Sequence, residues 1–474
     1  MKAPATPKPR PLPWACAAMG GTMLATPSRP RATFTGGATD SREVKPGNLF
    51  FALPGERVDG FDFCGQAAAA GAAALVVPAV RGMPAGCKGT PVIAVPDPRR
   101  ALGDLARAVR ARFPGRVVGV TGSNGKTTTK ELIAAALGAV GRVLSTKGNL
   151  NTDVGLPLTV LEANESEDFW VLEMAMRARG EIAYLADIAK PHVGVVTNVA
   201  GAHLERLGSV DEVARAKGEL FRGLDDGGVA VLPSDDPRIE REAGYLPESR
   251  KLRFGHIGNC QVRVLDVVPA GHRGSVVRVA VQATPLVIRL PLAGEHNARN
   301  AAAALAVVSA LRVPLHKAAA ALEGVVLPAH RSQLFARGGR TIMDDCYNAN
   351  PASMLAALRA VVASLGAFGR AFAVLGDMLE LGPAARKEHE EIGRKVFELG
   401  FTGLVALGEL ASHIAAGARS AGMPRNRVLA TLDPDLAAAS IAEWSQPGDW
   451  ILAKASRGMR LERALFAIER KLGG

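Results

Sequence analysis

The sequence predicts an α/β protein of three domains: a small mixed α/β N-terminal domain, a central doubly wound P-loop domain with a mostly parallel sheet, and a C-terminal Rossmann-like domain. The first reason is length, because 474 residues exceed what one hydrophobic core organises. The others are the alternation of short apolar segments with helical segments, and a glycine-rich loop between an apolar strand and a helix. The expected boundaries are a disordered extension at residues 1–13 and domains at 14–113, 114–325 and 326–474.

Residues 1–13 hold five prolines, which is typical of an extension rather than of a signal peptide. In the domain that follows, three apolar runs predict strands and an alanine-rich stretch predicts a helix. The strands are expected at residues 49–53, 74–77 and 92–95, and the helix at 66–71.

The central and C-terminal segments both alternate apolar strands with helices, which predicts mostly parallel sheets covered on both faces. Residues 252–290 instead alternate β-branched residues and predict an inserted antiparallel hairpin region. The central strands are expected at 117–120, 169–174, 193–198 and 229–232, with helices starting at 131 and spanning 210–224. The C-terminal strands are expected at 341–344, 371–375, 404–407, 428–431 and 450–453.

The loop in RVVGVTGSNGKTTTK, residues 116–130, has the arrangement that binds a nucleotide triphosphate. Backbone N–H groups would bind phosphate oxygens, Lys126 would meet the outer phosphate charge, and the Thr127 hydroxyl could ligate Mg²⁺. The spacing departs from G-x-x-x-x-G-K-[ST], because Val120 stands where the first glycine is usual. A helix-capping loop is the alternative, and the flanking strand, helix and three consecutive threonines favour the phosphate site.

Polar residues at the ends of two predicted strands are candidate Mg²⁺ ligands. Glu173 ends one strand, and His203 closely follows Asn198 at the end of another. The alternative is a solvated edge carboxylate and an ordinary polar histidine. Lys217 by itself would be interpreted as a solvent-facing helix lysine.

Composition restricts the class of protein. The net charge of +12 invites nucleic-acid binding, but aromatic residues are only 5% and no aromatic–basic platform is present, so we expect no nucleic-acid partner. A generally basic surface, or anionic small substrates, accounts for the charge equally well. Five scattered cysteines and the lack of a run of roughly 20 apolar residues predict a cytoplasmic protein with no membrane partner.

Six ordered segments together resemble the Mur ligases of peptidoglycan synthesis. They are GVTGSNGKTTTK, KGNLNTDVGLPLT, TNVAGAHLERLGS, RAKGELF, LAGEHNARNAAAA and DDCYNANPASM. The displaced glycine of the loop is the form that this family uses. Residues 40–63 resemble the family's uridine-nucleotide domain, while LGDMLELG (375–382) and SRGMRLE (456–462) resemble the member that adds a D-alanyl-D-alanine dipeptide.

The resemblance implies roles for individual residues. Lys126, His203, Lys217 and Arg331 are the implied catalytic residues. Two Mg²⁺ ions would be held by Thr127, Glu173, His203 and Lys217, the last as a carbamate. The implied ATP contacts are Thr121, Gly122, Ser123, Asn124, Gly125, Lys126, Thr127, Thr128, Asn297 (adenine), Arg331 (γ-phosphate) and Asp345 (ribose). The implied substrate contacts are Ser41, Arg42, Asn149, Asn151 and Thr152.

The implied activity is ATP-dependent joining of D-alanyl-D-alanine to UDP-N-acetylmuramoyl-tripeptide through an acyl phosphate, by a monomer. Residues 326–474 would bind the dipeptide and part of ATP. The nearest rivals are the family's diaminopimelate- or lysine-adding ligase and a folylpolyglutamate synthase. A basic nucleic-acid-binding NTPase is a rival of another class, and it rests only on the overall charge.

Overall fold

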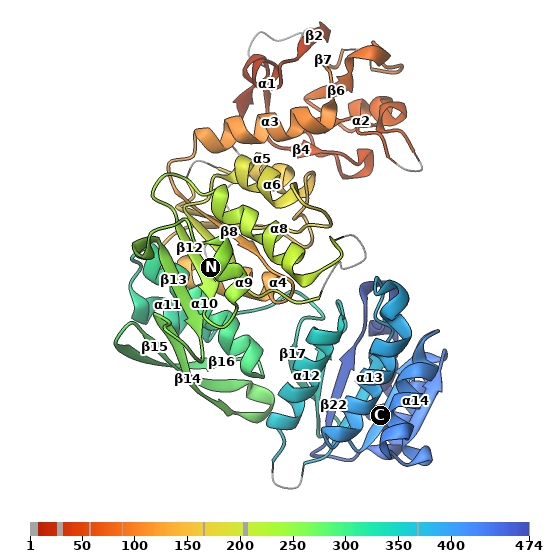
Figure 1. The fold of residues 1–474 in the computed structure, drawn as a ribbon. Coiled ribbons are helices and arrows are strands. Elements are labelled where there is room, and N and C mark those ends of the chain that lie inside the picture. The colour runs from red at the N-terminus through yellow and green to blue at the C-terminus, as the bar shows by residue number, and fades with distance from the viewer. Residues whose placement is uncertain are drawn as a thin grey trace. The chain divides into compact units, whose positions relative to one another are not determined.

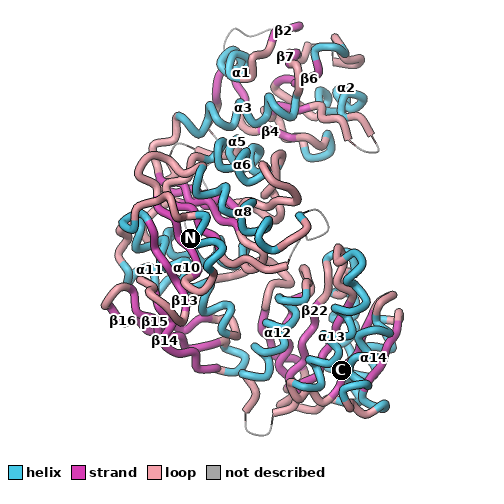
Figure 2. The backbone as a smooth tube through the Cα atoms, viewed as in Figure 1, coloured by secondary structure: helices cyan, strands magenta, loops and turns pink. Residues whose placement is uncertain are grey.

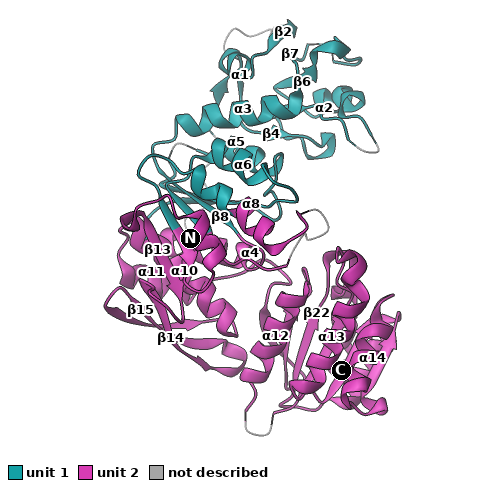
Figure 3. Cartoon of the chain, viewed as in Figure 1, with its two compact units in different colours: residues 1–121, 140–195, 218–230 teal, residues 122–139, 196–217, 231–474 magenta. Residues whose placement is uncertain are grey.

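The computed structural model describes residues 8–25, 32–55, 58–87, 89–164, 166–201, 207–366 and 369–473. The chain divides into two compact units, each assembled from segments that are distant in sequence (Figure 3). Unit 1 comprises residues 1–121, 140–195 and 218–230, and unit 2 comprises 122–139, 196–217 and 231–474.

The N-terminal part of unit 1 is a five-stranded sheet in the order β2-β7-β6-β5-β4. Its strands pair in parallel except for β2, which is antiparallel to β7. The helix α3 packs against β5 and β6 and runs along this sheet (Figure 1). The predicted strands and helix are confirmed, and α3 was not predicted. The elements are β2 (Thr22–Ala25), β4 (Gly37–Ala38), β5 (Leu49–Phe51), α2 (Cys64–Ala69), β6 (Ala74–Pro78), β7 (Val92–Val95) and α3 (Pro98–Ala111).

The predicted disordered extension is wrong over residues 10–13. There β1 (Arg10–Pro11) pairs with β3 (Thr33–Phe34), and α1 (Leu12–Ala18) begins directly after it. The buried Arg10 guanidinium donates hydrogen bonds to the carbonyls of Leu161, at 3.1 Å, and Ala163, at 2.6 Å. The prolines do not oppose this order, because proline is tolerated at sheet edges and in the first turn of a helix. Residues 1–7 lie outside the described part of the chain.

The central sheet has nine strands in the order β16-β15-β14-β13-β12-β11-β8-β10-β9. Residues 252–290 are antiparallel over β14–β16, as predicted (Figure 2), whereas β13 pairs with β14 in parallel. The strands are β8 (Arg116–Thr121), β9 (Val143–Ser145), β10 (Phe169–Glu173), β11 (Val193–Val196), β12 (Val229–Pro233), β13 (Lys251–Gly255), β14 (Val262–Pro269), β15 (Ser275–Val281) and β16 (Thr284–Leu290).

Helices associated with this sheet position the candidate site. In unit 2, α10 and α11 pack on α4, and the alanines at 301–304 of α10 are fully buried. In unit 1, α3 packs on α5 and α6. The helices are α4 (Lys126–Gly138), α5 (Gly155–Leu161), α6 (Glu181–Ala189), α8 (Val210–Arg222), α9 (Pro237–Glu242), α10 (Glu295–Ala310) and α11 (Leu315–Leu322).

The C-terminal sheet has six strands in the order β17-β18-β22-β19-β20-β21. All pairs are parallel except β17–β18, and a hydrophobic cluster lies on each face. Its five predicted strands are confirmed, while the antiparallel edge strand β17 was not predicted. The elements are β17 (Gln333–Arg337), β18 (Arg340–Asp345), α12 (Pro351–Ala363), β19 (Ala371–Gly376), α13 (Ala385–Glu398), β20 (Gly403–Leu407), α14 (Ala411–Ala421), β21 (Val428–Thr431), α15 (Pro434–Trp444), β22 (Trp450–Lys454) and α16 (Glu462–Leu472).

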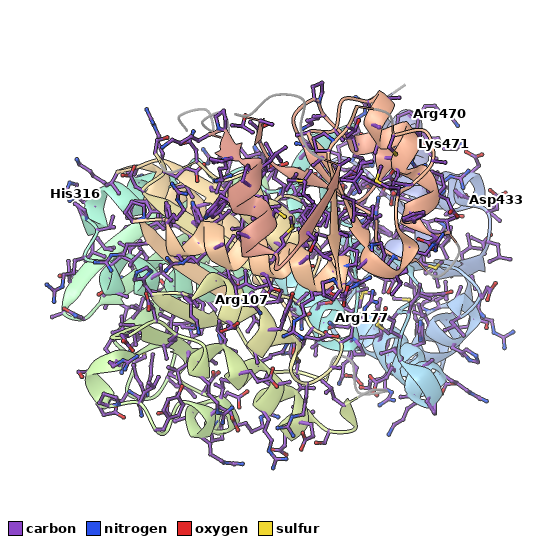
Figure 4. The ribbon with its side chains drawn as sticks, turned by 90° about the horizontal axis from the view of Figure 1, so that it is seen from above. Arg107, Arg177, His316, Asp433, Arg470 and Lys471 are labelled. Carbon is purple, nitrogen blue, oxygen red and sulfur yellow. The ribbon has the colours of Figure 1, made fainter. Side chains whose placement is uncertain are left out.

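Basic side chains come from several separate elements (Figure 4). Arg107 lies on α3, where it pairs with Asp104 and Asp187, and Arg470 and Lys471 end α16. Within the described ranges, no helix has the length and hydropathy of a membrane span.

Candidate functional site

The glycine-rich loop joins the end of β8 at Thr121 to the start of α4 at Lys126. Gly122 has φ +152°, and a Cβ there would lie 1.8 Å from Thr197 Oγ1. Gly125, the N-cap of α4, has φ +76°, and a Cβ there would lie 2.6 Å from Asn300 Oδ1. Both positions therefore require glycine.

Residues that follow β11 hold the backbone of this loop. Ser123 N and Asn124 N donate to the backbone oxygen and Oδ1 of Asn198, both at 3.0 Å. The Asn124 carbonyl accepts from Thr197 Oγ1 at 2.6 Å and from Asn198 Nδ2 at 2.8 Å. The Ser123 hydroxyl donates to the Ala200 carbonyl at 3.0 Å. The loop is therefore a preformed turn at a helix N-terminus, the arrangement that receives an anion.

Lys126 and the threonines occupy the first turn of α4. Lys126 Nζ donates to the loop carbonyls of Gly122, at 2.7 Å, and Ser123, at 3.3 Å. Thr127 and Thr128 are buried, and Thr121 Oγ1 is buried without a hydrogen-bond partner. The ammonium group therefore already lies on the loop that would surround a phosphate chain.

Replacing Gly122 by alanine is expected to weaken binding of an ATP analogue on the order of tenfold, because the backbone strain and the clash with Thr197 displace the loop. Calorimetric titration would measure it. Gly324→Ala is the matched control, since its nearest neighbour would lie 3.9 Å away. Equal affinities for both variants would contradict the role given to this turn.

In unit 1, Glu173 lies at the end of β10 and is 2% exposed. Its Oε1 accepts from Asn151 Nδ2 at 2.8 Å, and its backbone N donates to Thr146 Oγ1 at 2.9 Å. Its Oε2 is buried with no hydrogen-bond partner. A buried carboxylate oxygen without a donor is the arrangement that a cation would satisfy.

The predicted substrate loop, residues 147–153, is fastened at several points. Asn151 N donates to the Asn149 carbonyl at 2.8 Å, and the Asn151 carbonyl accepts from Ala175 N at 2.9 Å. The Thr152 carbonyl accepts from Leu156 N in the first turn of α5. Asn151, predicted as a substrate contact, thus also holds the candidate metal carboxylate, a link that sequence alone did not indicate.

In unit 2, Lys217 on α8 is 2% exposed, so the solvent-facing alternative is wrong. Burial, together with the positive charge of Lys126, lowers the pKa of the Lys217 amine well below its usual value. A neutral amine is therefore favoured, which is the form that can react with carbon dioxide.

The side chain of Asn297 is buried on α10. Its Nδ2 donates to the Ala293 carbonyl at 2.9 Å, and its Oδ1 accepts from Asn300 Nδ2 at 3.2 Å. Asn300 also lies against Gly125 of the glycine-rich loop. The predicted adenine contact and the predicted phosphate loop are thus joined through Asn300, which sequence reasoning missed.

At the end of β18, Asp345 accepts hydrogen bonds from Ser332 N at 2.9 Å and forms an ion pair with the buried Lys454. The Arg331 guanidinium stacks over the Tyr347 ring, 3.7 Å from its centroid, and its Nε is buried without a partner. Both predicted residues therefore lie at the same edge of the C-terminal sheet, Arg331 just before β17 and Asp345 at the end of β18. Lys454 was missed, and its position at the end of the neighbouring strand was the available signal.

In the N-terminal sheet region, Ser41 and Arg42 form a short 3-10 helix with Glu43. Ser41 is buried, and its hydroxyl donates to Gln66 Oε1 at 2.9 Å. The exposed Arg42 guanidinium pairs with Asp40 at 2.6 Å, and these hydrogen bonds lower the pKa of Asp40 to about 2.

His203 lies outside the described residues. Within the described ranges, no group of three or more His, Cys, Asp and Glu side chains could hold a metal ion.

Sequence models of three Mur ligase domains match the chain. The "Mur ligase family, catalytic domain" matches residues 33–110, the "Mur ligase middle domain" matches 120–308, and the "Mur ligase, glutamate ligase domain" matches 330–457. The chain belongs to the Mur ligase family. The fold class is the one predicted, with three Mur ligase domains on mostly parallel sheets.

Individual members of the Mur ligase family match over most of their length. The UDP-N-acetylmuramoyl-tripeptide–D-alanyl-D-alanine ligase of Bacillus subtilis (strain 168) is 37% identical, over 93% of this chain and 94% of that protein. The crystal structure of MurF from Acinetobacter baumannii matches with a TM-score of 0.88 at 30% identity, covering 98% of this chain and all of that one. The structure of MurF ligase from Thermotoga maritima in complex with ADP matches with a TM-score of 0.81 at 31% identity, covering 92% and 98%.

Proposed function

We propose that the protein is an ATP-dependent amide ligase that adds D-alanyl-D-alanine to UDP-N-acetylmuramoyl-tripeptide in peptidoglycan synthesis. The observation that carries this proposal is the 37% identity to the ligase of that name over 94% of its length. The phosphate loop, whose two glycines cannot carry a side chain, supports the use of ATP. The proposed domain boundaries are 114–325 for the central domain and 326–474 for the dipeptide-binding domain, as expected from the sequence, while the uridine-nucleotide domain extends back from 14–113 to include β1 at residue 10.

For ATP, we assign the phosphates to the backbone and side chains of residues 121–128. Lys126 supplies the positive charge, and Arg331 meets the γ-phosphate. Asn297 would contact the adenine and Asp345 the ribose, where the Lys454 ion pair and Ser332 N keep the carboxylate in place. The ADP named with the Thermotoga maritima structure supports a nucleotide site in this family.

Buried oxygen atoms in each unit support our proposal of a magnesium site. Glu173 has a buried carboxylate oxygen without a partner, and Thr127 has a buried hydroxyl in the first turn of α4. We assign Mg²⁺ ligation to Thr127, Glu173, His203 and Lys217. When bound, two Mg²⁺ ions would neutralise charge that develops on phosphate oxygens.

We assign Lys217 as a carbamate. A protonated amine would repel a metal ion, whereas a carbamate supplies an anionic oxygen. The lowered pKa of this buried lysine supports the assignment, because carbamate formation starts from the neutral amine. In this reaction the nitrogen bonds to the carbon of carbon dioxide and loses one proton.

The proposed reaction has two steps. A terminal carboxylate oxygen of the tripeptide attacks the γ-phosphorus, the bond to the β,γ-bridging oxygen breaks, and ADP leaves. The amine of D-alanyl-D-alanine then attacks the acyl carbon, the bond to the phosphate oxygen breaks, and the nitrogen loses a proton. Lys126 and Arg331 would stabilise the negative charge in the first step.

For the nucleotide peptide, we assign Ser41 and Arg42 to the uridine diphosphate, and Asn149, Asn151 and Thr152 to the peptide side. Arg42 is exposed and would exchange its Asp40 partner for a phosphate. We further propose that the protein is a cytoplasmic monomer that binds ATP, UDP-N-acetylmuramoyl-tripeptide and D-alanyl-D-alanine. We propose no nucleic-acid partner and no membrane partner.

An amine-choice assay tests the function. Phosphate release with ATP and UDP-N-acetylmuramoyl-tripeptide would be measured with D-alanyl-D-alanine, meso-diaminopimelate, lysine or glutamate as the amine. We expect turnover with D-alanyl-D-alanine and none above background with the others. Turnover that depends on any other amine would refute the proposal, and the Gly122→Ala variant serves as the ATP-site control.

A further inference from the structure

The residues after β11 make hydrogen bonds to the backbone of Asn124 in the phosphate loop, but not to its side chain. Thr197 and Asn198 bind only the backbone N–H and carbonyl of Asn124. The side-chain oxygen Oδ1 instead accepts a hydrogen bond from Asn350 Nδ2 at 2.7 Å, across 226 residues of sequence. The loop conformation and the amide orientation at Asn124 are therefore set by different parts of unit 2.

Asn350 is itself fixed in one orientation because it is the N-cap of α12. Its Oδ1 accepts from Ser353 N at 2.9 Å, and its backbone N donates to Ser353 Oγ at 3.0 Å, which completes a capping box. With Oδ1 committed to the helix, only the Nδ2 end of the amide remains to face Asn124. In this orientation Asn350 presents an N–H donor to Asn124.

The hydrogen bond from Asn350 Nδ2 determines which end of the Asn124 amide remains available to a ligand. A carboxamide has one acceptor end and one donor end, and Asn350 occupies the acceptor end. Asn124 Nδ2 makes no hydrogen bond to any described residue. Phosphate oxygens accept hydrogen bonds and repel a carbonyl oxygen, so the orientation that Asn350 imposes is the one that suits a triphosphate.

We propose that Asn350 is a positioning residue that orients the Asn124 amide so that its N–H groups serve the phosphates of ATP. The inference rests on the proposed ATP site in the loop and adds a residue from the C-terminal segment to it. By linkage, a bound nucleotide strengthens the Asn124–Asn350 hydrogen bond as much as that bond strengthens nucleotide binding.

The capping role of Asn350 supplies matched variants. Asn350→Ser keeps a good N-cap, but the shorter hydroxyl loses the donor to Asn124. Ser353→Ala breaks the capping box and leaves the Asn124–Asn350 hydrogen bond in place. The first variant should therefore change nucleotide binding without changing helix stability. The second should change helix stability without changing nucleotide binding.

The test measures affinity for a non-hydrolysable ATP analogue with Mg²⁺ by calorimetry, and the urea midpoint of unfolding. We expect Asn350→Ser to weaken binding roughly tenfold with an unchanged midpoint. Ser353→Ala should lower the midpoint and leave the Kd within about twofold. In an Asn124→Ala background, Asn350→Ser should change the Kd by less than about twofold, because the group it orients is gone.

Three outcomes would overturn the inference: unchanged affinity in Asn350→Ser, an equal loss of affinity in Ser353→Ala, or the same effect of Asn350→Ser in both backgrounds. The readout is independent of the amine. If Asn350→Ser weakens nucleotide binding as expected but the protein shows no turnover with D-alanyl-D-alanine, only the proposed substrate is refuted. If the protein turns over D-alanyl-D-alanine but Asn350→Ser does not weaken nucleotide binding, only this inference is refuted.

Discussion

Replacing Lys217 by alanine is expected to lower kcat on the order of 100-fold or more, because it removes an anionic oxygen ligand from the proposed Mg²⁺ site. The residue is buried and lies beside the charge of Lys126, so no surface role explains it. Added acetate or formate should restore part of the activity by supplying a carboxylate in the vacated space. The measurement is steady-state phosphate release with and without each anion.

Lys317→Ala on α11 is the control for this variant, because Lys317 is an exposed helix lysine. It should retain activity and show no response to acetate. Full activity of Lys217→Ala without any added anion would remove Lys217 from the reaction.

The depressed pKa of Lys217 also has a consequence for stability. In carbon-dioxide-free buffer, the unfolded chain binds a proton at this lysine that the folded chain does not, between the folded pKa and the ordinary value of 10.5. Stability of the uncarbamoylated protein therefore falls as pH decreases below 10.5. We expect Lys217→Met to be more stable than wild type near neutral pH, with a difference that shrinks as pH rises towards 10.5.

Replacing Glu173 by glutamine is expected to lower kcat roughly 100-fold or more and to raise the Mg²⁺ concentration needed for half-maximal activity. The substitution keeps a carbonyl oxygen for Asn151 and removes the charge from the buried oxygen that has no partner. Without metal, that removal relieves a desolvated charge. The variant should therefore have a higher Tm than wild type in EDTA, and a smaller increase on adding Mg²⁺ with an ATP analogue.

Glu398→Gln is the control, since Glu398 is a half-exposed carboxylate paired with Lys395 at the end of α13. Its activity and Mg²⁺ dependence should match wild type. A Glu173→Gln variant with normal Mg²⁺ dependence would refute metal ligation at this position.

Much of the fold could be predicted because apolar strands buried on both faces appear as short uninterrupted runs. Strands such as β6, β19 and β20 are of this kind and were located within a residue or two. The edge strand β17 was missed because its residues are only partly buried and alternate less clearly. Residues 10–13 were predicted as disordered because of their proline content. The two hydrogen bonds from Arg10 to distant carbonyls, which help to order this segment, cannot be recognised from the local sequence.

The sequence by itself determined the phosphate loop, because its glycines, lysine and threonines lie within a few residues and chain geometry alone brings them together. Only the tertiary structure decided the state of the other site residues. Burial of Lys217 lowers the pKa of its amine. Asn151 donates to one carboxylate oxygen of Glu173, and the other oxygen is buried without a partner. The bond from Asn350 to Asn124 spans 226 residues, and local patterns carry no information on contacts at such separation.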